Sequence, residues 1–185
     1  MIGGCVGTSN VLAGQMFDVP VMGTHAHSWI MSFKDEYTAF KEYARLYPDA
    51  CTLLVDTYDT LKSGVPNAIR VFTEMREAGI KPKSYGIRLD SGDLAYLSKK
   101  ARKMLDDAGF QDAVIAASND LDEFLIHDLK MQGAAISSWG VGTNLITSKD
   151  CPSFGGVYKL AAIQNAEGEF QPKIKISENI EKITN

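Results

Sequence analysis

The 185-residue sequence lacks the features that mark several classes of protein. It has no apolar run near the ~20 residues of a membrane-spanning helix. Met1 is followed by Ile2 and two glycines rather than by the basic and apolar regions of a signal peptide. Lys and Arg are dispersed and the formal net charge is −4, so the sequence has no basic stripe for nucleic acid. We therefore expect neither a membrane nor a nucleic acid among its partners.

Cysteine is scarce as well. Cys5, Cys51 and Cys151 lie far apart in the sequence. Without a C-x-x-C pair they indicate neither a zinc site nor a disulfide framework. Reduced thiols are typical of cytoplasmic proteins, and we expect that location.

Histidine is equally scarce, yet two of the three histidines stand together, in Gly23–Trp29 directly after a β-like run. A strand that ends in this way delivers imidazoles to the mouth of an α/β fold. Two interpretations compete: a metal-dependent barrel hydrolase that uses His25 and His27, or one reactive histidine with a neighbour. The hydrolase needs further histidine ligands, and only His127 remains, inside a predicted helix. The metal interpretation is therefore the weaker one.

The rest of the chain repeats one unit, an apolar strand followed by a polar turn and an amphipathic helix. The expected strands are Val19–Gly23, Cys51–Val55, Ser84–Leu89, Ala113–Ala117 and Ala134–Val141. Their apolar runs are mostly continuous, which suits parallel strands covered on both faces. Helices are expected from Ser32, after Pro66, from Asp93 and from Asp120.

This alternation predicts an α/β fold with a parallel sheet. Either an open doubly wound sheet or part of a barrel fits, and five strands fall short of the eight of a closed barrel. After residue 150 the pattern changes: Gly156–Ile163 and Phe170–Ile176 flank the turn Asn165–Gly168, which indicates a β-hairpin. We expect an α/β body of one of these two kinds over residues 1–150 and a hairpin appendage over 151–185.

Polar residues gather where each predicted strand ends. The clusters are His25 with His27, 56–60, 88–93, 118–120 and 140–144. Many of these residues could simply cap helices or form tight turns. Arg88 is harder to explain in this way, because an arginine within an apolar strand needs an anionic partner. Either Asp90 or a phosphate would serve.

The clusters favour an anionic substrate with several hydroxyl groups, such as a phosphorylated sugar with Mg²⁺. Backbone N–H groups near Gly142 and Thr143 could cradle a phosphate. Asp56 could orient His27 through one of its ring nitrogens. His25 would then have a supporting or a structural role.

Several of these motifs, taken together and in order, resemble the nicotinate phosphoribosyltransferase family. They are Gly7–Asn10, Gly23–Ser28, Asp56–Thr60, Gly86–Leu94, Ser118–Asp122, Gly140–Thr143 and Gly155–Leu160. The resemblance implies a type II phosphoribosyltransferase barrel that joins nicotinate to phosphoribosyl pyrophosphate in NAD biosynthesis. It implies further that ATP hydrolysis is coupled to the transfer through a phosphohistidine and that Mg²⁺ assists.

The resemblance also assigns roles to single residues. It implies that His27 is the phosphohistidine and that Asp56 orients it. It places Thr24, Arg88, Asp90, Ser118, Asn119, Gly142 and Thr143 against the substrates. Ser9 stands where the similar nicotinamide-using enzyme has an acid, and a neutral hydroxyl favours the carboxylate of nicotinate.

The family's full chains are longer than this one, so we expect a fragment of the central barrel. The resemblance implies a homodimer in the full-length form. A third hypothesis follows from the length: a truncated chain that keeps binding or subunit-contact surfaces but has no turnover of its own.

Overall fold

A computed structural model describes residues 3–153 and 160–173 of the chain. The chain forms two compact units, Met1–Thr147 and Ser148–Asn185. The helices of the first unit are α1 Val11–Phe17, α2 His27–Met31, α3 Glu36–Leu46, α4 Val65–Glu77, α5 Leu94–Asp107, α6 Glu123–Met131 and α7 Thr143–Ile146. A π-helical turn, η1 Thr60–Gly64, leads directly into α4. The strands are β1 Ala50–Leu54, β2 Ser84–Leu89, β3 Val114–Ala117 and β4 Ser138–Trp139.

The four strands form one parallel sheet in the order β1-β2-β3-β4. Parallel strands in sequential order, joined by right-handed crossovers, place their connecting helices on one face of the sheet. A doubly wound sheet instead reverses its strand order and carries helices on both faces. The arrangement is therefore a sector of an α/β barrel, which confirms the predicted fold class.

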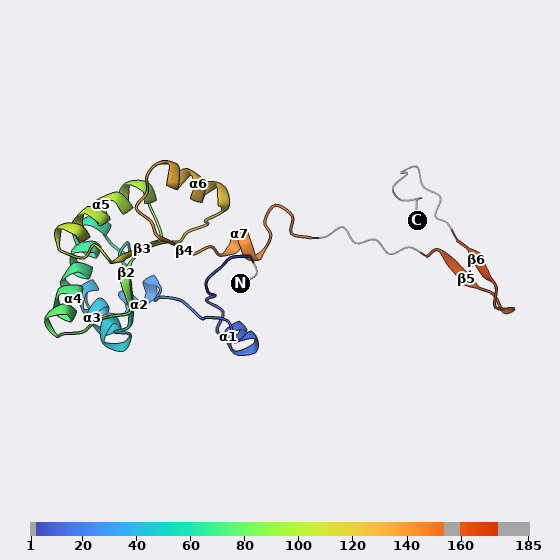
Figure 1. The fold of residues 1–185 in the computed structure, drawn as a ribbon, viewed down its shortest axis with the longest axis horizontal. Coiled ribbons are helices and arrows are strands. Elements are labelled where there is room, and N and C mark those ends of the chain that lie inside the picture. Colours follow the sequence, from blue (N-terminus) through green and yellow to red (C-terminus); the bar gives the residue numbers. More distant parts are fainter. Residues whose placement is uncertain (1–2, 154–159, 174–185) are drawn as a thin grey trace. The chain divides into compact units, whose positions relative to one another are not determined.

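Helices α3, α4 and α5 lie side by side along the sheet (Figure 1). Their apolar faces meet the strands in one continuous core, and the side chains of Phe40, Leu53, Leu54, Ile87 and Leu105 are completely buried. Each such side chain stabilises the fold by about 1.5–3 kcal/mol. This core holds the carboxyl ends of β1, β2 and β3 in fixed positions.

Aspartates set where the helices begin. Asp35, Asp93 and Asp122 cap α3, α5 and α6, and each side chain accepts a backbone N–H three residues further on. Two expected helix starts are therefore wrong. Ser32 ends α2 instead, where its hydroxyl donates to the carbonyl oxygen of Trp29 at 2.6 Å. Asp120 stands outside α6 with a left-handed φ of 45°.

Two of the expected strands are also wrong in extent. Val19–Gly23 does not join the sheet; only Val21 pairs, in an isolated parallel bridge with Thr8. Pro20 has no N–H to donate, and its carbonyl oxygen is taken by the Thr8 N–H at 3.0 Å. The expected strand Ala134–Val141 is reduced to Ser138–Trp139.

Two glycines permit close approaches that no side chain would allow. A Cβ on Gly64 would stand 1.8 Å from the carbonyl oxygen of Val55, where η1 meets the chain just after β1. A Cβ on Gly86 in β2 would stand 2.0 Å from the carbonyl oxygen of Val114 in β3. Both contacts lie in the framework that carries the strand ends.

The second unit contains the predicted hairpin. Strand β5 Ala162–Gln164 pairs antiparallel with β6 Phe170–Pro172. The Asn165 side chain accepts the backbone N–H of Glu169 at 2.8 Å and closes the turn. Residues 156–159 and 174–176 of the expected strands lie outside the described residues. Among the described residues, no helix has the length and apolar character to cross a membrane.

Candidate active site

His27 is the first residue of α2, and its ring lies among side chains from the ends of β1 and β2. Its Nδ1 is 3.0 Å from Oγ1 of Thr57, a hydrogen bond. Its Nε2 faces two carboxylates, with Asp90 Oδ2 at 3.6 Å and Asp56 Oδ1 at 4.0 Å. The side chain is 38% exposed. The imidazole is thus oriented by the hydrogen bond at Nδ1, and its exposed part remains accessible to a reactant.

Asp56 is almost completely buried, with its side chain 2% exposed. Its Oδ2 accepts the backbone N–H of Asp90 and the hydroxyl of Ser91, both at 2.7 Å. The carboxylate therefore fixes the loop that follows β2. It makes no hydrogen bond to His27, and Thr57 makes that contact in its place. Sequence reasoning missed Thr57, although the residue stands next to a predicted site aspartate.

Asp90 and Ser118 join the ends of β2 and β3. The Ser118 hydroxyl donates a hydrogen bond to Asp90 Oδ1, while the other carboxylate oxygen faces His27. Since β2 and β3 are neighbouring parallel strands, their carboxyl ends meet at one edge of the sheet. The structure therefore brings together His27, Asp56, Asp90 and Ser118, as the sequence led us to expect.

Arg88 makes different contacts from those predicted. Its Nη1 donates to Thr24 Oγ1 at 2.5 Å and its Nη2 to the carbonyl oxygen of His25 at 3.1 Å. Asp90 is not its partner. Its Nε is buried and has no hydrogen-bond partner. The guanidinium is thus held by neutral oxygens, and a bound anion would balance its charge.

The segment after β3 has an unusual backbone. Asn119 and Asp120 have φ values of 89° and 45°, which side-chain-bearing residues rarely adopt. Asn144 at the start of α7 holds this segment, because its Nδ2 donates to the carbonyl oxygens of Asp120 and Leu121 at 2.7 and 3.2 Å. Strain maintained by a second element is typical of functional loops.

The remaining predicted residues lie less close together. Gly142 caps α7 and Thr143 begins it, just after β4. Ser9 is exposed on a bend before α1. The described part of the chain shows no hydrogen bond between Ser9 and the residues around His27, so its role stays a prediction.

The contacts of the histidine pair do not favour a metal centre. Among residues 3–153 and 160–173, no group of three or more His, Cys, Asp or Glu side chains could hold a metal ion. Both ring nitrogens of His25 lie against backbone groups, with Nε2 at 3.3 Å from the Leu54 N–H and Nδ1 at 3.4 Å from the Ala26 oxygen. The hydrolase interpretation is therefore not favoured.

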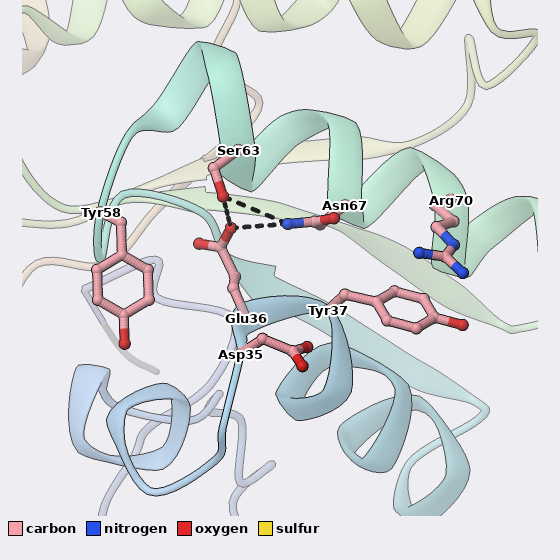
Figure 2. A pocket seen from close by; sticks show the side chains of 7 residues that line it. All are labelled: Asp35, Glu36, Tyr37, Tyr58, Ser63, Asn67 and Arg70. Carbon is pink, nitrogen blue, oxygen red and sulfur yellow. Dashed lines mark hydrogen bonds between the residues drawn. The ribbon is translucent and has the colours of Figure 1, made fainter.

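A second polar cluster lies where α3 meets η1 and α4, beside an open pocket of about 510 Å³ (Figure 2). Glu36 is only 4% exposed. One of its carboxylate oxygens accepts hydrogen bonds from Ser63 and, at 3.0 Å, from Asn67, and the other is buried without a partner. The cluster connects the start of α3 to the helix that follows the Asp56 loop.

Ligands of parallel α/β sheets bind at the carboxyl ends of the strands, and a histidine and two carboxylates gathered there are typical of an enzyme. A model of the Nicotinate phosphoribosyltransferase (NAPRTase) family matches residues 2–184. The chain therefore belongs to this family.

Individual relatives agree with the family match. Nicotinate phosphoribosyltransferase of Bacillus subtilis (strain 168) is 60% identical over 184 residues, which cover all of this chain and 36% of the relative. The protein of that name in Dictyostelium discoideum is 40% identical and matches over 99% of this chain and 38% of its own length. The crystal structure of human Nicotinic Acid Phosphoribosyltransferase superposes with a TM-score of 0.69 and 30% identity, over 76% of this chain and 38% of that one. The chain thus spans between a third and two fifths of the length of these three relatives.

Proposed function

We propose that this chain is the part of a nicotinate phosphoribosyltransferase that carries the reactive histidine. In the reaction, the ring nitrogen of nicotinate attacks the anomeric carbon of phosphoribosyl pyrophosphate. The bond from that carbon to pyrophosphate breaks, and nicotinate mononucleotide and pyrophosphate form, a step of NAD biosynthesis. The family match over residues 2–184 supports this assignment.

The observation that carries the ATP-dependent half of the proposal is the hydrogen bond between His27 and Thr57. When Nδ1 donates its proton to the Thr57 hydroxyl, the lone pair of the imidazole lies on Nε2. That nitrogen can attack the γ-phosphorus of ATP, with ADP as the leaving group. Hydrolysis of the resulting phosphohistidine returns the free imidazole and phosphate.

The two carboxylates that face Nε2 fit a role for Mg²⁺. Asp56 Oδ1 is buried without a hydrogen-bond partner, and Asp90 Oδ2 is 3.6 Å from Nε2. Proteins commonly bind Mg²⁺ through one or two carboxylates together with substrate phosphates and water. When bound, Mg²⁺ would offset the repulsion between these carboxylates and the phosphate groups of a substrate.

Arg88 and the loops after β3 and β4 are proposed to hold the phosphorylated sugar. Arg88 has two neutral partners, Thr24 and His25, so a phosphate oxygen would supply the missing negative charge. We assign the ribose 5-phosphate region to Ser118, Asn119, Gly142 and Thr143. We also propose a cytoplasmic location and a homodimer for the full-length form.

The experiment uses the full-length protein and, in parallel, the 185-residue chain. Each is incubated with nicotinate, phosphoribosyl pyrophosphate and ATP, and nicotinate mononucleotide is measured. Labelling with γ-³²P-ATP then tests the phosphohistidine. His27→Ala should abolish the label, while His127→Ala on the exposed side of α6 should leave it unchanged. Turnover without any labelled histidine would rule out the ATP step. If the full-length protein turns over and the 185-residue chain does not, the result would support the hypothesis that this chain is an inactive fragment.

A further inference from the structure

His25 stands two residues before the proposed phosphohistidine, and its ring contacts the edge of the sheet. Its Nε2 accepts the backbone N–H of Leu54, the last residue of β1, at 3.3 Å. The next N–H along the chain, that of Val55 just after β1, donates to the carbonyl oxygen of Arg88 in β2 at 3.1 Å. Successive N–H groups of a strand point to opposite sides, so the Leu54 N–H lies on the edge of β1 that faces away from β2. His25 therefore provides a partner for a backbone group that would otherwise be buried without one.

The contacts of the ring also define its protonation. Since Nε2 accepts a hydrogen bond, the ring proton lies on Nδ1, 3.4 Å from the Ala26 carbonyl oxygen. The residue is 8% exposed, and its ring packs edge-on against Tyr43, with ring centroids 4.5 Å apart. A proton on Nε2 would point at the Leu54 N–H and would break the contact.

The backbone of His25 holds a second part of the site. Its carbonyl oxygen accepts Nη2 of Arg88 at 3.1 Å, and the preceding hydroxyl of Thr24 accepts Nη1. Two residues further on, His27 begins α2. One side chain thus attaches to β1 the short segment from which both the Arg88 contacts and the reactive imidazole arise.

We propose that His25 is a positioning residue, whose neutral imidazole anchors residues 24–27 to the end of β1 and thereby fixes the Arg88 guanidinium and the His27 ring. The functional part of this proposal rests on the proposed roles of Arg88 and His27. The anchoring part rests only on the contacts described above. His25 itself touches no reacting atom.

The electrostatic surroundings of the ring support a neutral state. Burial is the main cause that lowers the pKa of His25 from 6.5 to about 4, and the Arg88 and His27 charges act in the same direction. The other titratable group packed on the ring, the Tyr43 phenol, has a raised pKa because of its own burial. The ring is therefore uncharged at neutral pH.

Two substitutions distinguish the hydrogen bond between His25 and Leu54 from other effects of the ring. In His25→Gln the side-chain amide oxygen can take the place of Nε2 and accept the Leu54 N–H. In His25→Asn the shorter amide corresponds to Nδ1 and does not reach Leu54. Both replacements are polar and neither can titrate, so they differ mainly in the hydrogen bond to β1.

The test combines NMR of the folded chain with binding and kinetics of the full-length protein. Imidazole ¹⁵N spectra should show the Nδ1–H form of His25 with no titration above about pH 5, consistent with its buried ring. His25→Asn should speed amide exchange of Leu54 at least tenfold and shift the Arg88 side-chain resonances, while His25→Gln should leave both near the wild type. For the full-length protein, His25→Asn should raise the KM for phosphoribosyl pyrophosphate and the Kd for inorganic pyrophosphate about tenfold. His25→Gln should stay within threefold.

Each outcome decides the proposal. A His25 that titrates near its ordinary pKa, an Nε2–H tautomer, or equal behaviour of the Asn and Gln variants would overturn it. If the wild-type full-length protein neither binds pyrophosphate nor turns over, the proposed function fails by itself. The tautomer, Leu54 exchange and Arg88 resonances then still decide whether His25 is the anchor.

Discussion

The ring of His27 and the hydroxyl of Thr57 are joined by a hydrogen bond of 3.0 Å at Nδ1. Thr57 lies in the loop that follows β1, directly after the buried carboxylate of Asp56. The hydroxyl, rather than the carboxylate, therefore sets the orientation of the imidazole. Asp56 acts one step further away, through the backbone N–H of Asp90.

Replacement of Thr57 by valine should slow phosphorylation of His27. Valine keeps the shape of threonine but removes the hydroxyl, and a hydrogen bond of this kind contributes about 1 kcal/mol. We expect a fall of roughly five- to tenfold in the rate of ³²P incorporation from ATP. Thr57→Ser, which keeps the hydroxyl, should retain most of the rate. Equal rates for the valine variant and the wild type would contradict this role.

Glu36→Ala should lower the free energy of unfolding by about 2–3 kcal/mol, because Ser63 and Asn67 lose a buried acceptor. Glu42→Ala is the matched control on the same helix, since its partner Arg45 is an exposed neighbour at 2.9 Å. Such surface pairs contribute at most about 1 kcal/mol. Urea denaturation at pH 7 measures the change in the free energy of unfolding for both variants. A similar small loss for the two variants would show that the buried carboxylate is not a structural link.

Stability should fall with acid in a window defined by His25. The pKa of this group is about 4 in the folded chain against an ordinary value of 6.5. Between these values the unfolded chain binds a proton that the folded chain does not, so the free energy of unfolding decreases as the pH falls. The slope from this group is about 1.4 kcal/mol per pH unit, or about 3 kcal/mol across the window. Above pH 6.5 the contribution is fully present, and below pH 4 no further loss arises from it.

Urea denaturation of the wild type and His25→Gln at pH 7, 5.5 and 4.5 checks this window. Glutamine keeps the acceptor for Leu54 but cannot bind a proton. The difference between the two proteins isolates His25, because all other titrating groups are shared. The variant should lose less stability than the wild type as the pH falls, and parallel losses would refute the assignment.

Ser9→Asp should lower kcat/KM for nicotinate about tenfold or more, because a second carboxylate repels that of the substrate. Ser9→Ala, which removes the hydroxyl without adding charge, should have a smaller effect. Kinetics of the full-length protein with nicotinate provide the measurement. Unchanged nicotinate kinetics in a folded aspartate variant would remove Ser9 from the substrate site.

The parts of the fold that follow local rules were predictable from the sequence. Strand β2 has the predicted bounds Ser84–Leu89, because an apolar run between polar turns defines both of its ends. Helix α5 begins after Asp93 as expected, since an aspartate there accepts the N–H of Tyr96. The gathering of His27, Asp90 and Ser118 followed from parallel strands, whose carboxyl ends share one edge.

Contacts between distant segments were not predictable in this way. Glutamate is usually found on the surface, and Glu36 is buried only because α3 packs against α4. The partners of Arg88 come from Thr24 and His25, in a segment expected to be a strand and its end. The role of His25 depends on an edge N–H of β1, which no local pattern reveals.

The glycine at position 86 has a consequence for how the protein can vary. A side chain there would strike the backbone of Val114, so β2 and β3 would have to move apart. Asp90 and Ser118 follow these two strands and are joined by a single hydrogen bond. The absence of a side chain at Gly86 thus permits the close spacing of β2 and β3, and with it the contact between Asp90 and Ser118. Every substitution of Gly86 adds a Cβ and is therefore expected to change the spacing between Asp90 and Ser118, although Gly86 is not itself one of the proposed site residues.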